Sequence, residues 1–271
     1  IASHLLLICF TWLSRMNSPL SLAGACSCCV SLRAAGWRGG AFCCRDVMAF
    51  DLNAACSGFV YGLSVADQFI RTGHYKTILV VGAEILHHKV NYEDRGTCIL
   101  FGDGAGAAVV ARAPEGAQSY ILSSHAHADG SLANLLYVPS GGSVEPFTQR
   151  SIDEKRHFVV MEGREIFKHA VRTMSRVCTE ALEANNITID EVDWIIPHQA
   201  NTRIIEAVAK HLGVSMDKVI VNIEHMGNTS AATCPVAFNQ ALHSGKIKKG
   251  DLVLFTAFGA GLTSGSVLMR Y

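Results

Sequence analysis

The sequence has no excess of charge of either sign, because 23 lysine and arginine residues match 23 aspartate and glutamate residues. This balance does not favour a nucleic-acid-binding or membrane-surface protein, which needs basic residues to attract phosphates. No apolar run approaches the roughly 18 residues that span a bilayer. Only 17% of residues are charged and 49% are hydrophobic, which excludes a disordered chain. A soluble α/β protein of 271 residues remains, long enough to bury a sizeable core.

Residues 1–45 lack lysine, aspartate and glutamate, yet they contain six of the ten cysteines. These cysteines are not spaced as the ligand pairs of a zinc finger or ribbon, so a zinc site is not favoured. The short apolar run Leu5–Phe10 has no basic residues before it, which argues against a signal peptide and for a cytoplasmic protein. A disulfide framework disagrees with the single, scattered cysteines that follow. We therefore expect residues 1–45 not to be a native part of the fold.

From residue 46 onward, one strand–turn–helix–strand pattern occurs twice. The first copy comprises Val47–Leu52, Asn53–Gly58, Phe59–Arg71 and Thr77–Gly82, and a further strand is expected at Ala107–Ala111. The second comprises Val219–Asn222, Gly227–Ala232, a helix to His243, Asp251–Ala257 and then Thr263–Met269. Cys56 precedes Gly73 by 17 residues, and Asn228 precedes Gly245 by the same number. We therefore expect Cys56 and Asn228 to occupy matching helix N-termini that face one cleft.

A histidine follows a third strand. The strand is predicted at Val192–Pro197, His198 comes next, and a helix is predicted over Arg203–Leu212. Ligands of open α/β sheets bind at the carboxyl ends of the strands, so His198 is expected near the same cleft.

These three side chains could form a Cys-His-Asn catalytic set. The unpaired N–H groups and the dipole of the helix after Cys56 are expected to lower the pKa of its thiol. Each residue also has a plain structural interpretation: a buried cysteine, a hydrogen-bonded core histidine and an asparagine that caps a helix. Their combination, rather than any one of them, favours catalysis.

Five short segments occur in the order typical of one enzyme family. They are N-A-A-C-S-G at Asn53–Gly58, R-G-T-C-I-L-F-G-D-G-A-G-A-A at Arg95–Ala108, P-H-Q-A-N at Pro197–Asn201, G-N-T-S-A-A at Gly227–Ala232 and F-G-A-G at Phe258–Gly261. The chain from about Val47 onward thus resembles β-ketoacyl-acyl-carrier-protein synthase III of the thiolase superfamily. The resemblance implies a homodimer and a five-layer α-β-α-β-α fold built from two halves, here residues 46–150 (incomplete) and 151–271.

The resemblance also implies a reaction. Cys56 would take an acyl group from acetyl-CoA or another acyl-CoA, while the backbone N–H groups of Cys56 and Ala260 hold the oxyanion. His198 and Asn228 would then stabilise the enolate formed when malonyl-acyl-carrier protein loses carbon dioxide. The implied substrate contacts are Arg95, Gly163, Phe167, Asn201 and Phe258, the acyl-pocket residues are Leu100 and Phe101, and the carrier-protein contacts are Arg203 and Lys210. No metal or cofactor is implied beyond the coenzyme A thioesters.

Departures from the family pattern leave alternatives open. The family has two strand–helix units before its nucleophile, which residues 1–45 do not match, so we expect this chain to be poorly folded or inactive as written. The family also carries tryptophan where Ser264 stands. A thiolase would need a second cysteine in Phe258–Gly261, and a papain-like protease would be rich in disulfides. A condensing enzyme with a CoA-bound extender and an inactive truncated pseudo-enzyme remain the alternatives.

Overall fold

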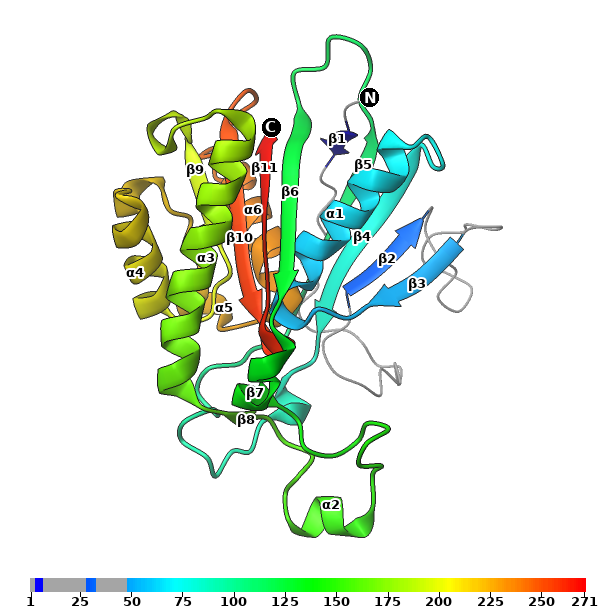
Figure 1. Cartoon of the computed structure of the whole chain (residues 1–271), viewed down its shortest axis with the longest axis vertical. Coiled ribbons are helices and arrows are strands. Elements are labelled where there is room, and N and C mark those ends of the chain that lie inside the picture. The colour runs from blue at the N-terminus through cyan, green and yellow to red at the C-terminus, as the bar shows by residue number, and fades with distance from the viewer. Residues whose placement is uncertain (1–2, 7–27, 33–47) are drawn as a thin grey trace.

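The computed structural model describes residues 3–6, 28–32 and 48–271, which form two main β-sheets and the helices around them (Figure 1). The first sheet has the strand order β1-β5-β4-β2-β3 and comprises β1 (Ser3–Leu6), β2 (Cys28–Leu32), β3 (Met48–Leu52), β4 (Thr77–Glu84) and β5 (Gly104–Arg112). The second has the order β6-β11-β10-β9 and comprises β6 (Tyr120–Ala128), β9 (Trp194–Pro197), β10 (Leu252–Gly259) and β11 (Thr263–Arg270). A small pair joins β7 (Leu136–Tyr137) to β8 (Val160–Met161).

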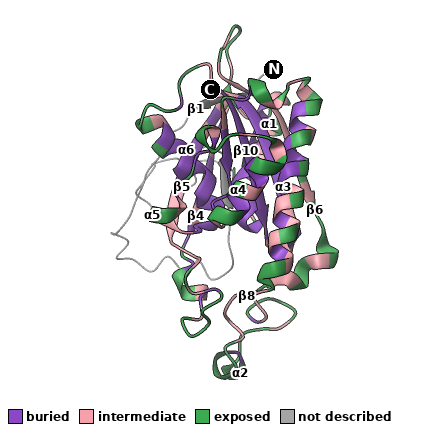
Figure 2. Cartoon of the chain, turned by 90° about the vertical axis from the view of Figure 1, so that its left-hand side faces the viewer, coloured by how far each residue is buried: buried purple, intermediate pink, exposed green. Residues whose placement is uncertain are grey.

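The helices arrange these sheets into layers. They are α1 (Gly58–Arg71), α2 (Gln149–Asp153), α3 (Gly163–Asn185), α4 (Thr202–Leu212), α5 (Ile223–Met226) and α6 (Thr233–His243). Helices α1 and α6 lie between the two sheets, and α3 covers the far side of the second sheet with α4 packed beside it (Figure 1). Strand β10 is buried along its whole length because helices cover both of its faces (Figure 2). The described residues thus supply four of the five expected layers.

Helix α1 follows the sequence prediction closely. Phe59, Leu63 and Ile70 recur at helical spacing and are buried against the sheets. The helix ends before Gly73, whose φ of +76° is the left-handed conformation that glycine adopts without strain. The turn that carries Cys56 therefore leads into a helix that the core fixes along its length.

The strand predicted at Val219–Asn222 was wrong. Only Val219 makes a β-bridge, to Ile195, and the chain then turns into α5. The backbone N–H of Asn222 donates to the side-chain Oε1 of Gln199 at 2.9 Å rather than to a neighbouring strand. An apolar run of this length is compatible with a strand, but here a side-chain acceptor replaces the backbone acceptor of a neighbouring strand.

The internal repeat is real, but its predicted register was wrong by three residues. Ala55 and Ser230 both have left-handed backbones, with φ of +48° and +50°. In both turns an asparagine two residues earlier accepts a hydrogen bond from the left-handed residue: Asn53 Oδ1 from Ala55 at 3.4 Å, and Asn228 Oδ1 from Ser230 at 2.8 Å. Asn228 therefore corresponds to Asn53 rather than to Cys56. The equal spacing of 17 residues from Cys56 to Gly73 and from Asn228 to Gly245 gave the wrong register, because α1 has 14 residues and α6 has 11.

Of residues 1–45, the structure describes the backbone of two strands. Strand β2 lies between β3 and β4 and is antiparallel to both, and β1 pairs antiparallel with β5. Cys28 and Cys29 belong to β2, and the other four cysteines of the segment, Cys9, Cys26, Cys43 and Cys44, lie outside the described residues. In the described part of the chain, no helix combines the length and apolar character that crossing a membrane requires.

Candidate active site

The first component of the site is a strained turn that carries Cys56. A short 3₁₀ turn, Ala55–Ser57, connects β3 to α1, and the left-handed Ala55 is an unusual conformation for a residue with a side chain. Such a backbone costs of the order of 1–3 kcal/mol and persists only where its surroundings hold it. Here Ala54 O accepts hydrogen bonds from Ser57 N at 3.1 Å and from Thr263 Oγ1 at 2.7 Å. The turn is therefore anchored from the second sheet.

The second component is the corresponding turn with Asn228. Its backbone bonds to the loop before β5, through Asn228 N to Leu100 O at 2.8 Å and Gly102 N to Asn228 O at 2.9 Å. Its Oδ1 accepts from Ser230 N, which leaves the Nδ2 amide as the free donor end of the side chain. The turn thus presents an oriented hydrogen-bond donor.

The third component is His198, which follows Pro197 at the end of β9. Its backbone N–H donates to Thr256 O at 2.7 Å, and its ring Nδ1 lies 2.7 Å from Thr233 Oγ1. The side chain is buried, and burial lowers its pKa to about 3, so the imidazole is neutral at physiological pH. A neutral ring with one nitrogen engaged has the other available to a substrate.

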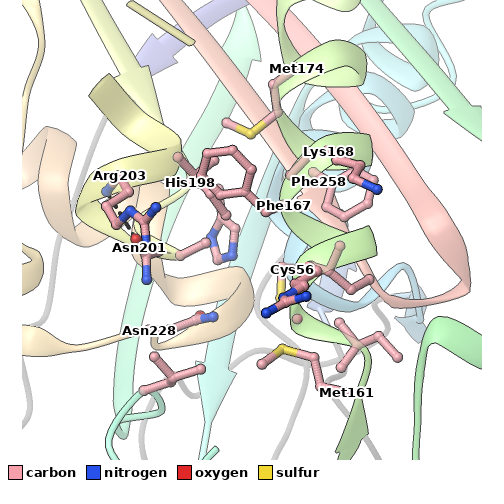
Figure 3. Close-up of a pocket in the computed structure, with 18 of the residues that line it drawn as sticks. Cys56, Met161, Phe167, Lys168, Met174, His198, Asn201, Arg203, Asn228 and Phe258 are labelled. Carbon is pink, nitrogen blue, oxygen red and sulfur yellow. Dashed lines mark hydrogen bonds between the residues drawn. The ribbon is translucent and has the colours of Figure 1, made fainter. Parts of the chain in front are cut away.

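These three side chains point into one cavity of about 960 Å³ (Figure 3). Ten of the predicted site residues line it: Cys56, Leu100, Phe101, Gly163, Phe167, His198, Asn201, Arg203, Asn228 and Phe258. The wall is mostly apolar, which suits an acyl chain, and its polar groups are few and convergent. The arrangement can therefore hold an acyl thioester beside the Cys56 sulfur.

Three predicted residues do not line the cavity: Arg95, Ala260 and Lys210. Arg95 is exposed and adjoins Gly96, which does line it. Lys210 is exposed on α4, about two turns beyond Arg203. Ala260 lies in the turn after β10, directly behind the nucleophile turn.

Gly259 shows how closely those two turns approach. A Cβ at this position would lie 2.6 Å from Cys56 N, closer than real Cβ atoms come to backbone, and 3.1 Å from Ala54 O. Only glycine fits there, and its absence of a side chain brings the backbone of residues 259–260 next to that of Cys56. This proximity is what an oxyanion hole from Cys56 and Ala260 N–H groups requires.

The predicted lowering of the Cys56 pKa was wrong. Burial raises the pKa of this thiol to about 12, and the Glu84 carboxylate nearby also raises it, while a hydrogen bond with the Ser230 side chain acts in the opposite direction. Loss of hydration at this buried sulfur outweighs the polar groups around it. At neutral pH Cys56 is therefore a thiol, and an attack by its sulfur would require the proton to leave.

We expect the rate of Cys56 alkylation by iodoacetamide to rise about tenfold per pH unit from pH 6 to 9, without a plateau. The reactive form is the thiolate, and its fraction increases tenfold per unit below a pKa of about 12. Mass spectrometry of the labelled peptide at each pH measures the rate, and acetyl-CoA should protect the peptide. A plateau below pH 8 would show that the resting residue is already a thiolate.

The sequence interpretation missed several cavity residues on α3. Ile166, Ala170 and Met174 line the cavity together with the predicted Gly163 and Phe167. Their spacing of three and four residues places them on one helix face, so helical periodicity from Gly163 could have identified them. The cationic Arg164 and Lys168 also line the cavity and belong to the same helix. This helix forms one wall of the site.

Two family models match the chain. The model of 3-oxoacyl-[acyl-carrier-protein] synthase III matches residues 50–130, and the model of the C-terminal part of that enzyme matches residues 182–271. A β-ketoacyl-[acyl-carrier-protein] synthase III from Caldanaerobacter subterraneus is 49% identical over 226 residues, which are 83% of this chain and 68% of the relative. The chain belongs to the β-ketoacyl-acyl-carrier-protein synthase III family.

Other members of the synthase III family support this assignment. One from Xylella fastidiosa is 52% identical over 223 residues, covering 82% of this chain and 67% of that protein. The crystal structure of the Aquifex aeolicus synthase III superposes with a TM-score of 0.76 at 48% identity, covering 84% of this chain and 68% of the other. The predicted family, enzyme class and thiolase-like fold are thereby confirmed.

Proposed function

We propose that this chain catalyses the decarboxylating condensation of an acyl-CoA, most simply acetyl-CoA, with malonyl-acyl-carrier protein, the first condensation of fatty acid synthesis. The observation that carries the proposal is the convergence of Cys56, His198 and Asn228 on one apolar cavity in a chain of the synthase III family. Cys56 follows β3, His198 follows β9 and Asn228 follows α5. Hydrogen bonds hold the three turns: Thr263 Oγ1 donates to Ala54 O in the Cys56 turn, Thr233 Oγ1 contacts the His198 ring, and Ser230 N–H donates to the Asn228 side chain.

The first half-reaction transfers the acyl group to Cys56. The sulfur attacks the thioester carbonyl as its proton departs, and the carbonyl oxygen becomes an oxyanion held by the N–H groups of Cys56 and Ala260. The carbon–sulfur bond to coenzyme A then breaks, and the CoA sulfur takes a proton. The products are an acyl-Cys56 thioester and free CoA. Hydrogen bonding from Ser230 stabilises the sulfur as negative charge develops on it.

The second half-reaction forms the carbon–carbon bond. The malonyl carboxylate leaves as carbon dioxide, and its bonding electrons move toward the thioester carbonyl oxygen. The ring N–H of His198 and the Nδ2 amide of Asn228 donate to that oxygen. Because neither donor is charged, both act most strongly where the negative charge develops. The carbanion attacks the acyl carbon, and the Cys56 sulfur leaves as a thiolate. This thiolate takes a proton from solvent, which returns the resting thiol for another cycle.

The mouth of the cavity is suited to anionic substrates. Arg164, Lys168 and Arg203 line it, and Arg203 lies 5.8 Å from the centre of the Phe167 ring. Asn201 caps α4 by accepting from Arg203 N at 2.9 Å, which orients both residues. These cations and the exposed Arg95 and Lys210 would attract the phosphates of CoA and an acidic carrier protein. We also propose that the protein is a homodimer, that it is located in the cytoplasm, and that its reaction uses no metal.

A reconstituted assay tests the function and the role of Arg203 together. Purified protein with acetyl-CoA and malonyl-acyl-carrier protein should release carbon dioxide and β-ketoacyl product, and malonyl-CoA should be a much poorer extender. Arg203→Glu should raise KM for the carrier-bound substrate about tenfold or more, because we assign Arg203 to the carrier-protein contact. It should change KM for acetyl-CoA less, because Arg164, Lys168 and Arg95 remain to attract its phosphates. Arg176→Glu is the matched control, because it reverses a charge at an exposed position in the C-terminal half of α3.

Three results would contradict this proposal. Equal use of malonyl-CoA would favour a condensing enzyme with a CoA-bound extender. A cooperative thermal melt without condensation would favour the inactive pseudo-enzyme. Equal KM changes in Arg203→Glu and Arg176→Glu would show that Arg203 makes no specific contact with the carrier protein.

A further inference from the structure

A buried hydroxyl lies between the catalytic histidine and the turn that carries Asn228. Thr233 is the first residue of α6, and its side chain is only 2% exposed. Its Oγ1 lies 2.7 Å from His198 Nδ1 and 2.9 Å from Ser230 O, and it also contacts the thiol of Cys234. This hydroxyl therefore connects His198 to the same turn that orients Asn228 and contacts Cys56.

The hydroxyl has one hydrogen and two strong acceptors within reach, the Nδ1 lone pair of His198 and the carbonyl oxygen of Ser230. Ser230 O also accepts a hydrogen bond from the backbone N–H of Thr233. The carbonyl therefore keeps a partner if the hydroxyl turns away from it, so this rotation leaves no buried acceptor unsatisfied. Donation to Nδ1 gives each acceptor one donor, whereas donation to Ser230 O gives that oxygen two donors and requires the ring hydrogen to be on Nδ1.

We propose that Thr233 is a positioning residue that donates its hydroxyl hydrogen to His198 Nδ1 and so fixes the ring hydrogen on Nε2. A neutral imidazole carries one hydrogen, and the partner of one nitrogen decides which nitrogen holds it. With Nδ1 accepting from Thr233, Nε2 becomes the donor that the proposed condensation needs. This inference rests on the proposed function, because the second half-reaction requires a donor at His198.

The opposite arrangement would make His198 Nε2 an acceptor instead of a donor. If the hydroxyl donated to Ser230 O, Nδ1–H would donate to Thr233 Oγ1 and Nε2 would carry a lone pair. That lone pair would repel the negative charge on the substrate oxygen, and decarboxylation would be lost while Cys56 remained intact. The choice between the two tautomers is therefore a choice between donor and acceptor at the cavity.

Nitrogen-15 NMR of the intact protein, labelled in its histidine rings, tests the tautomer directly. The His198 signals are identified by their loss in His198→Asn. We expect a protonated Nε2 and an unprotonated, hydrogen-bonded Nδ1 in the unmodified chain and in Thr233→Ser, which keeps the hydroxyl. In Thr233→Val the preference should weaken to a mixture. Thr229→Val is the matched control, because its equally buried Oγ1 has no hydrogen-bond partner among the described residues.

Kinetics give a second, independent measurement. Thr233→Val should lower malonyl-carrier decarboxylation on the order of 10–100-fold, as expected when a residue that orients a histidine is lost, and acyl transfer to Cys56 should change by less than about threefold. Thr233→Ser should restore decarboxylation. A purely structural role would lower both half-reactions together.

Three outcomes would overturn the proposal. They are an Nδ1–H tautomer in the unmodified chain, an unchanged tautomer in Thr233→Val, or equal losses of both half-reactions. If Thr233→Val does not fold, the spectra of the unmodified chain and of Thr233→Ser still decide which nitrogen is protonated. The spectra do not depend on turnover, so an Nε2–H tautomer in a chain that fails to condense would reject the proposed function alone.

Discussion

Replacement of Cys56 by alanine is expected to abolish condensation, with a loss on the order of 10⁴–10⁶-fold in kcat. The sulfur is the only atom in the proposed mechanism that bonds to the acyl group, and no other cysteine lines the cavity in the described part of the chain. Intact-protein mass spectrometry after incubation with acetyl-CoA should show no acetyl adduct. Decarboxylation of malonyl-carrier protein should persist, because His198 and Asn228 remain in place.

A second cysteine gives the matched control for this experiment. Cys98 is half-buried in the loop before Leu100 and does not line the cavity. Cys98→Ala should therefore retain both the acetyl adduct and condensation. An acetyl adduct on Cys56→Ala, or its loss in Cys98→Ala, would place the nucleophile elsewhere.

The sequence predicted that Cys56, His198 and Asn228 lie at one cavity, and it could do so because their motifs are local. Asn53–Gly58 and Gly227–Ala232 each specify a tight turn of small residues before a helix, and the structure forms both. His198 was predicted from its place after a buried strand, and β9 ends at Pro197. Where a few adjacent residues determine the backbone, the sequence pattern is sufficient.

The errors arose where distant segments decide the outcome. The helix N-terminus near Cys56 was expected to lower its pKa, but burial of the sulfur has the larger effect and raises it. The strand expected at Val219–Asn222 is prevented by a single side chain, Gln199, which takes the backbone N–H that a strand partner would accept. Neither the burial nor the Gln199 contact is visible in the local sequence.

The repeat shows a third kind of error. The predicted register aligned the two copies at Gly73 and Gly245, where their helices end. Because α1 and α6 differ in length, this alignment displaced the turns at the helix starts. The geometry that the two copies share is the turn itself, in which Asn53 and Asn228 are equivalent hydrogen-bond acceptors. One copy thus presents the residue after its left-handed position, Cys56, and the other presents the asparagine before it, Asn228, so the two turns contribute different groups to one cavity.

His198→Ala and Asn228→Ala should each lower malonyl-carrier decarboxylation and condensation by about 10²–10³-fold, the usual loss when one donor to an oxyanion is removed. Acyl transfer to Cys56 should be retained within a few-fold, because its oxyanion is held by backbone N–H groups. The double variant should lose less than the product of the two single losses, since both donors serve one oxygen. Rates of carbon dioxide release and of acetyl-enzyme formation measure the two half-reactions separately.

The pH dependence distinguishes a neutral donor from a charged one. Burial holds the pKa of His198 at about 3, so the ring stays neutral as pH falls through 6.5. The rate of decarboxylation by the unmodified chain should therefore show no His198-dependent inflection near pH 6.5, and His198→Ala should not change the shape of the pH profile there. His74→Ala, at an exposed histidine after α1, is the matched control and should retain both half-reactions. If decarboxylation instead required protonation with an apparent pKa near 6.5 and lost this dependence in His198→Ala, the imidazolium would be the working form. The proposed pair of neutral donors would then be wrong.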